Sequence, residues 1–321
     1  NQGLDKISSK MPSVLDTNAI KQNYFSKDAH QLTGVLKIST SKGQQIVATG
    51  KTLKRWNTDN RTYAHFKIDQ PSNFEMQITS ASFDRERAFL ENVNTTVWYK
   101  KSHYFNTDIY KDAVAFGLKF INTHLDGYPY KELNIAEIPY YGDAFYSSAN
   151  LILISEKEGW RADTSLKKEE SYIYFSVITQ LIRQKLLYYN EIANVQGANM
   201  LSIALPQAIA LQAIKEKFGK EILDSYLKTK HNKYAKGRGN EANTEPILIY
   251  ADGSNYLEPN KGVLALFSLS NKIGFEVFNK VLVQYINSNK VIVFKNVYQQ
   301  LLKVVLKENK ESVRLNFEKV D

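Results

Sequence analysis

Histidines and closely spaced carboxylates are the residues of this sequence that could hold a metal ion or move a proton. A catalytic zinc site of the helical type needs two histidines four residues apart on one helix face, with a glutamate beside the first as general base. None of the five histidines has a second histidine or a carboxylate at that spacing within a helix-periodic segment. We therefore interpret each as a surface or packing histidine. The five are His30, His65, His103, His124 and His231.

One carboxylate pair, Glu156 and Glu158, follows the apolar run at 151–154. We interpret this pair as a solvated turn. Other reaction classes lack their signatures, because the sequence contains no Gly-x-Ser-x-Gly elbow, no Walker A loop and no dinucleotide fingerprint. It also contains no cysteine, which excludes disulfides, thiolate metal sites and cysteine nucleophiles.

The charge balance is basic, with 42 Lys and Arg against 33 Asp and Glu, a formal net charge of +9. Most of the basic residues are scattered, which is typical of a basic soluble surface and not of a nucleic-acid interface. One denser run could bind nucleic acid, and this alternative predicts an affinity that falls steeply with salt. The run consists of Lys228, Lys230, Lys233, Lys236 and Arg238.

The elements that must position any site change in type along the chain. Residues 1–105 alternate apolar and polar positions and predict strands of a β-sandwich-like domain. Residues 106–235 mix helix-periodic segments with two short apolar strands, and 236–321 are mainly helical. The sequence therefore predicts an α+β protein, in which both ends of the chain are expected to be the edges of a longer protein.

Several phrases resemble a known family, the gluzincin aminopeptidases of the membrane alanyl aminopeptidase type, peptidase family M-one. More narrowly, they resemble the aminopeptidase-like domain that some bacteria fuse to an ABC-transporter permease. The resemblance covers most of the chain from about residue 50 onward, and it implies a β domain, a thermolysin-like α/β domain and a truncated helical region. The phrases are HYFNTDIYKDAVAFGLKFI, YPYKELNIAEIPYY, ANVQGANMLS, KYAKGRGNEA and YLEPNKGVLALFSLSNKIGFEVFNKVL.

In that family the zinc ligands and general base form His-Glu-x-x-His, and the resemblance places this motif on Thr179, Gln180 and Arg183. A threonine hydroxyl is a poor zinc ligand, arginine has no lone pair to give, and an amide cannot act as a base. The third ligand, a glutamate in the family, falls on Ser202 or Ile203. The implied zinc site is therefore degenerate, and we expect no zinc there.

Two further family residues are also replaced. The tyrosine that would stabilise the tetrahedral intermediate falls on Pro259. The Gly-x-Met-Glu-Asn loop falls on residues 146–150, where Ala149 replaces the glutamate that would bind the substrate's amino terminus and Asn150 alone matches. We expect Ala149 and Asn150 to line a vestigial substrate cleft. Arg183 could pair with a cleft carboxylate and close the metal position.

The resemblance thus implies a catalytically inactive, zinc-aminopeptidase-like domain that binds a peptide or protein. Its implied partner is an ABC-type permease, and its implied location is the extracytoplasmic side of a bacterial envelope, tethered to the membrane in the full-length protein. We expect no nucleic-acid partner. The alternative is an active zinc aminopeptidase that uses non-standard ligands or a ligand from another subunit.

Overall fold

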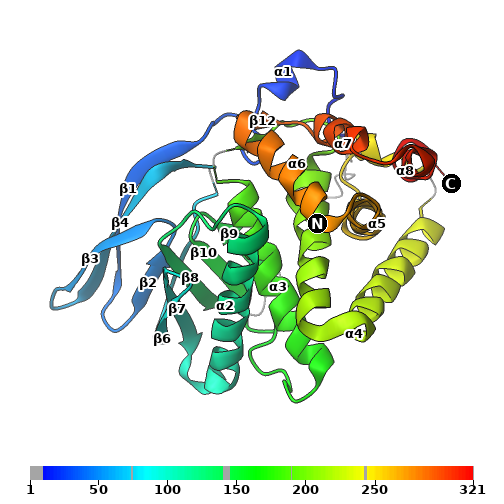
Figure 1. Cartoon of the computed structure of the whole chain (residues 1–321). Helices are drawn as coiled ribbons and strands as arrows, with labels where there is room; N and C mark the ends of the chain where they lie inside the picture. Colours follow the sequence, from blue (N-terminus) through cyan, green and yellow to red (C-terminus); the bar gives the residue numbers. More distant parts are fainter. Residues whose placement is uncertain (1–9, 74, 140–144, 189, 242–243, 321) are drawn as a thin grey trace.

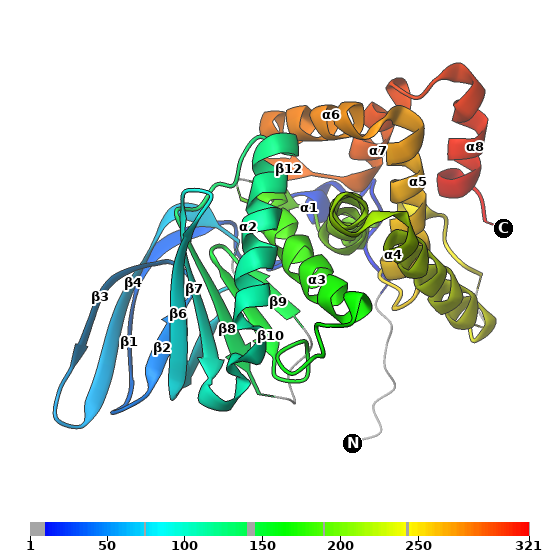
Figure 2. The ribbon, with the colours of Figure 1, turned by 60° about the horizontal axis from the view of Figure 1, so that its bottom comes forward.

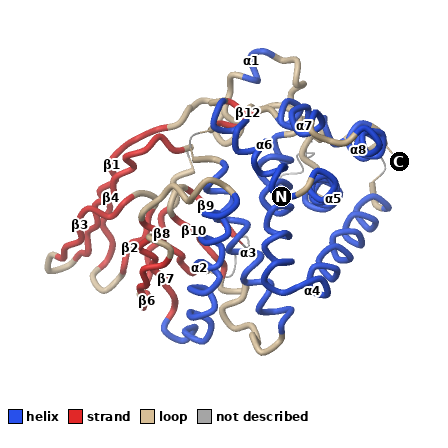
Figure 3. The backbone as a smooth tube through the Cα atoms, viewed as in Figure 1, coloured by secondary structure: helices blue, strands red, loops and turns tan. Residues whose placement is uncertain are grey.

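The structure is a computed structural model of the whole chain, in which residues 10–73, 75–139, 145–188, 190–241 and 244–320 are described. Strands dominate the first part of the chain and helices the last (Figures 1 and 3). The prediction of a protein that mixes helix and sheet is confirmed.

The first strands form two small antiparallel sheets that pack face to face. One has the order β1-β4-β3 and the other pairs β2 with β5. Alternate positions of β4 are buried, and its Ala64 and Phe66 pack on Ile46 and Ala48 of β2. A short helix, α1, precedes them. The elements are α1 (Thr17–Ile20), β1 (Leu32–Ser41), β2 (Gln45–Ala48), β3 (Lys51–Asn57), β4 (Arg61–Ser72) and β5 (Ile78–Ala81).

A five-stranded sheet with the order β6-β7-β8-β10-β9 forms the centre of the described chain. Strands β7, β8 and β10 are parallel to one another, whereas β6 and β9 run antiparallel at the two edges. The predicted boundary after residue 105 divides this sheet, because β6 and β7 precede it; the division into three domains stays a prediction. The strands are β6 (Phe83–Leu90), β7 (Val93–Lys100), β8 (Glu132–Ile138), β9 (Phe145–Ser148) and β10 (Leu151–Ser155).

Helices α2 (Thr107–His124) and α3 (Lys167–Leu186) cover one face of this sheet (Figure 2). The other face packs on Val47 of β2. Burial on both faces explains why β8 and β10 read as continuous apolar runs. The two helices can approach closely because Gly117 has no side chain: a Cβ there would lie 2.8 Å from Leu181 Cδ1. The 3-10 helix η1 (Lys101–Asn106) connects β7 to α2.

The rest of the described chain is helical. The long helix α4 bends at Gly219, where φ is +81°, and continues to Gly239. None of the helices in the described ranges has the length and apolar character needed to cross a membrane. The elements are β11 (Glu191–Ile192), π-helix η2 (Met200–Ala204), α4 (Leu205–Gly239), η3 (Leu248–Tyr250), π-helix η4 (Leu257–Gly262), α5 (Val263–Ile273), α6 (Phe275–Ser288), β12 (Val291–Ile292), α7 (Phe294–Lys303) and α8 (Lys307–Glu318).

Candidate functional site

Helix α3 presents its polar side chains to the edge strand β9. Gln180 accepts a hydrogen bond from the Ser147 hydroxyl at 2.7 Å. Thr179 is buried, and its hydroxyl has no hydrogen-bond partner in the described part of the chain. Neither side chain carries an ionisable group, so neither can supply negative charge to a metal ion or accept a proton as a base.

Arg183 connects three segments across this edge. Its guanidinium binds both carboxylate oxygens of Glu75 at 2.9 and 3.1 Å. It also donates to the Ser147 carbonyl at 2.6 Å and the Ser147 hydroxyl at 2.8 Å, and it lies 5.1 Å from the Phe25 ring centroid. The ion pair anticipated for Arg183 is therefore present, with Glu75 as the carboxylate.

Ser202 and Ile203 lie on the π-helix η2, and Pro259 lies on the π-helix η4. The Ser202 hydroxyl is buried without a hydrogen-bond partner among the residues described. Pro259 has no side-chain donor, and its carbonyl accepts a hydrogen bond from Lys230 at 2.7 Å. None of the three offers a charged ligand or a phenolic hydroxyl.

Glu258, beside Pro259, is the buried acid of this region. Its side chain exposes 0% of its surface, and one carboxylate oxygen accepts the Gly253 N–H at 2.7 Å. The other oxygen has no partner within the described ranges. Burial, together with the nearby charge of Asp252, raises the pKa of Glu258 to about 6.

Tyr24 and Phe25, from the segment before β1, fill the space beside these residues. The Tyr24 hydroxyl donates to Asn199, and its backbone N–H donates to the Ile192 carbonyl at 2.7 Å. Burial raises the pKa of Tyr24, and the nearby Glu258 adds to the rise. This contact was missed in the sequence, where residues 1–50 showed only sheet periodicity.

Ala149 and Asn150 do line a pocket, which has a volume of about 280 Å³ and lies between β4 and the β8–β10 edge. Ala149 also lines a smaller pocket that reaches Arg183. The Asn150 amide is already engaged, because it accepts the Gly50 N–H at 2.8 Å and donates to the Gly50 carbonyl at 3.2 Å. Asn150 therefore fixes the pocket wall.

The side chains at this edge of the sheet do not fit a catalytic zinc ion. Zinc takes three nitrogen, sulfur or carboxylate ligands plus water. The positions implied by the family supply two hydroxyls, an amide, an aliphatic side chain and a fixed cation already bound to Glu75. Glu258 is a single carboxylate, and no reaction step through zinc follows from this arrangement.

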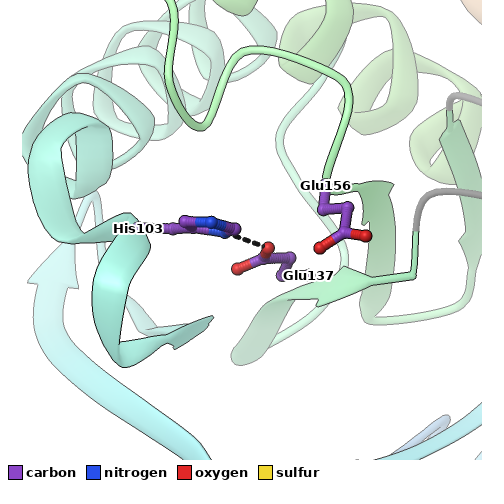
Figure 4. A group of neighbouring side chains, drawn as sticks. All are labelled: His103, Glu137 and Glu156. Atoms are coloured by element: carbon purple, nitrogen blue, oxygen red, sulfur yellow. Dashed lines mark hydrogen bonds and ion pairs between the residues drawn. The ribbon is translucent and has the colours of Figure 1, made fainter.

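The sequence search missed a group at another edge of the same sheet. In the described residues, potential ligand atoms of His103, Glu137 and Glu156 lie within 4.8 Å of one another (Figure 4). Glu156 and Glu158 do lie in a turn, but both are half-buried and Glu158 accepts the Tyr172 hydroxyl at 2.6 Å, so the turn is only partly solvated. The signal that could have found the group is strand order, since each residue stands at the end of a strand.

Two other histidines have structural contacts that fit the sequence interpretation. His30 pairs with Glu191 at 3.0 Å, and His124 packs between the Phe120 and Phe275 rings. His103 differs because it is buried against a carboxylate, Glu137.

Part of the basic run serves the fold. Lys230 donates to the Pro259 carbonyl and to Gln207, and burial, with the charge of Lys233, lowers its pKa to about 8. Arg238 lies 4.0 Å from the buried Glu245. These contacts favour a structural role for these two residues of the run.

No protein-family model and no curated protein matches the sequence. Among solved structures, an M1 zinc metallopeptidase from Deinococcus radiodurans matches with a TM-score of 0.71 and 13% identity, covering 92% of this chain and 67% of the other. A point mutant of a two-domain M1 zinc metallopeptidase bound to L-arginine matches with a TM-score of 0.68 and 14% identity, covering 91% and 65%. At this identity the likeness establishes the fold: an M1-peptidase-like fold of helices and sheets.

Proposed function

We propose that this chain is a zinc-aminopeptidase-like module that does not hydrolyse peptides and acts by binding. The Arg183 contacts carry the proposal. A guanidinium held by Glu75 and Ser147 puts a permanent positive charge where the family would place a histidine ligand. A second cation beside it would be repelled, and Gln180, at the position of the family's general base, cannot take a proton from water.

Hydrolysis of aminoacyl reporter amides tests the proposal. The purified chain should show no turnover above a blank, whether it is treated with chelator or supplied with zinc. Turnover that a chelator abolishes and zinc restores would instead establish the alternative, an active aminopeptidase with non-standard ligands. Zinc content alone does not decide the question, because the protein has acidic and histidine side chains elsewhere.

The pocket at Ala149 is the binding site in this proposal, and its ligand is a peptide segment or a partner's chain end. Its wall carries charges of both signs, including Lys51, Lys67, Asp69 and Glu132. Since Ala149 has no carboxylate to hold an amino terminus, binding should not depend on a free amino end. The main chain of β9 is less available, because Arg183 already occupies the Ser147 carbonyl.

Fluorescence anisotropy with a labelled peptide and its N-acetylated form tests this part. The two should bind equally, and Ala149→Phe, which fills the pocket, should weaken binding about 10-fold, about the effect of 1.4 kcal/mol. Ser165→Phe, at an exposed position outside the pocket, is the matched control. Unchanged binding by Ala149→Phe would place the peptide elsewhere.

The proposed partner is an ABC-type permease, and the proposed location is the extracytoplasmic side of a bacterial envelope, with a membrane tether in the full-length protein. The support is the resemblance of ANVQG and MLS, residues 193–197 and 200–202, to the transporter-fused group. Cell fractionation and copurification of the full-length protein test the assignment. Recovery of the full-length protein from the cytosol alone, without a permease, would contradict it.

A further inference from the structure

His103, Glu137 and Glu156 converge at one edge of the central sheet, away from the Arg183 contacts. Figure 4 shows the His103 ring pointing to Glu137 and the Glu156 carboxylate approaching from the next strand. A His103 ring nitrogen, Nδ1, is hydrogen-bonded to Glu137 Oε1. All three residues offer a potential ligand atom within 4.8 Å of the other two.

The topology explains why these three residues meet. Strands β7, β8 and β10 are neighbours and all run parallel, so their carboxyl ends lie side by side. His103 follows β7 in η1, Glu137 lies near the end of β8, and Glu156 comes directly after β10. The carboxyl edge of parallel strands is where α/β proteins commonly bind ligands.

The group is held in place by the backbone. Glu137 exposes only 4% of its surface, and its second oxygen accepts the Lys100 N–H at 2.8 Å. The backbone N–H of Glu156 donates to the Ile138 carbonyl at 2.8 Å, which fixes the start of its loop to β8. His103 exposes 7%. A pre-positioned cluster of this kind loses little side-chain freedom on binding an ion.

The charge of Glu137 also favours a cation. Among the residues described, its partners are the His103 ring and a backbone amide, with no lysine or arginine. A buried carboxylate without a cationic partner is costly. An ion bound between Glu137, Glu156 and His103 would neutralise the charge of Glu137, while the imidazole would supply a neutral nitrogen ligand.

We propose that His103, Glu137 and Glu156 form a binding site for a divalent transition-metal ion, separate from the position implied by the aminopeptidase family. Two ligands bound to one ion at about 2.0–2.2 Å lie at most ~4.4 Å apart, so the observed span needs only small side-chain movements. In the bound state the His103 nitrogen gives its lone pair to the ion. Three protein ligands leave a position for water.

One imidazole and two carboxylates select among ions. Imidazole nitrogen suits Zn²⁺, and carboxylates suit Mn²⁺, whereas Mg²⁺ and Ca²⁺ prefer oxygen ligands alone. We expect Zn²⁺ to bind most tightly, Mn²⁺ less tightly, and Mg²⁺ at least about 100-fold more weakly than Zn²⁺.

Isothermal titration of the chelator-treated whole chain with Zn²⁺, Mn²⁺ and Mg²⁺ tests the site. His103→Gln and Glu156→Gln should each weaken Zn²⁺ binding about 100-fold or more, beyond the 10-fold to 100-fold range of outer-shell changes. Glu158→Gln and His30→Gln are matched controls, since both residues lie outside the group. The controls should keep the wild-type affinity within about 2-fold, a difference of ~0.4 kcal/mol.

If His103→Gln fails to fold, Glu156→Gln still tests the site, because Glu156 is half-buried and its substitution should disturb the fold less. Co²⁺ bound in place of Zn²⁺ gives a second readout, a visible absorption band that Glu156→Gln should abolish. No Zn²⁺ binding by the folded wild-type chain would overturn the proposal. Equal affinity in the wild type and a folded Glu156→Gln would also overturn it, because the ion would then be held elsewhere.

Discussion

Two edges of the same five-stranded sheet differ in the partners that their buried or half-buried carboxylates have. At the β9 edge, the Arg183 guanidinium binds Glu75 and the Ser147 carbonyl, so the chain supplies its own cation. At the carboxyl edge of β7, β8 and β10, Glu137 has an imidazole and a backbone amide as its described partners. One edge is neutralised by a side chain, and the other retains ligands that an ion could use.

The two edges differ in whether the basic side chain can lose its proton. An arginine side chain is always protonated, so Arg183 keeps its positive charge beside Glu75. A histidine can give up its proton and offer a lone pair. The two edges therefore differ in whether a side chain there can give up a proton and bind an ion.

Metal addition should separate the two edges with the largest effect. Zn²⁺ at 100 times its dissociation constant should raise the free energy of unfolding by about 2.7 kcal/mol. The effect should fall to about 0.4 kcal/mol or less in His103→Gln, whose affinity should be about 100-fold weaker, and it should be retained in Arg183→Met. Urea unfolding with and without Zn²⁺ measures it. If Arg183→Met lost the effect and His103→Gln kept it, the two assignments would be reversed.

Arg183→Met should destabilise the fold by about 2 kcal/mol. It removes the cation from Glu75 and the donor from the Ser147 carbonyl; both partners of the ion pair are partly exposed, at 17% and 27%, so the loss should fall below that of a fully buried pair. The urea midpoint measures the change. Glu75→Gln and the double variant complete a mutant cycle, and a coupling energy near zero would show that the pair contributes nothing.

The sequence anticipated the helices well because their apolar positions repeat regularly. Residues 171–186 bury Ile173, Val177 and Leu181 at four-residue spacing. Thr179, Gln180 and Arg183 could be placed on one helix for the same reason. The Arg183 ion pair was expected, although its partner Glu75 is 108 residues away and could not be named.

The sequence did not show which distant strands pair with one another. Strands β6 and β7 alternate like those before them, yet they join the sheet of β8–β10, so the predicted boundary at 105 divides that sheet. Parallel neighbours bring His103 to Glu137 and Glu156, and no local spacing encodes that contact. The placement of Tyr24 beside Asn199 likewise depends on the tertiary fold.

Glu258 offers a test of the β9 side that depends on pH. Its pKa is about 6 in the folded protein, above the ordinary value of 4.5, so the fold favours the protonated acid. Stability from this group is present below about pH 4.5 and falls by about 2 kcal/mol in all as pH rises through about 6.

Glu258→Gln should remove that slope, because the amide carries no charge at any pH. It should stabilise the fold by about 1 kcal/mol at pH 7.5: the buried charge is lost and the amide oxygen still accepts the Gly253 N–H, whereas the NH₂ group gains no partner and offsets part of the gain. Unfolding free energies measured from pH 4 to pH 8 give the slope. An unchanged slope in the variant would assign the pH dependence to other groups.

Ser147→Ala should destabilise the fold by about 1 kcal/mol, because it removes the hydroxyl shared by Gln180 and Arg183 and leaves the carbonyl contact in place. The exposed Ser165→Ala is a control that should change stability by less than about 0.5 kcal/mol. If Ser147→Ala and Arg183→Met together cost less than their sum, the two residues act as one network. Strict additivity would mean that Arg183 stabilises this edge through Glu75 and the Ser147 carbonyl alone. The charge of the guanidinium, and not the network of hydroxyl hydrogen bonds, would then be what distinguishes the β9 edge from the His103 edge.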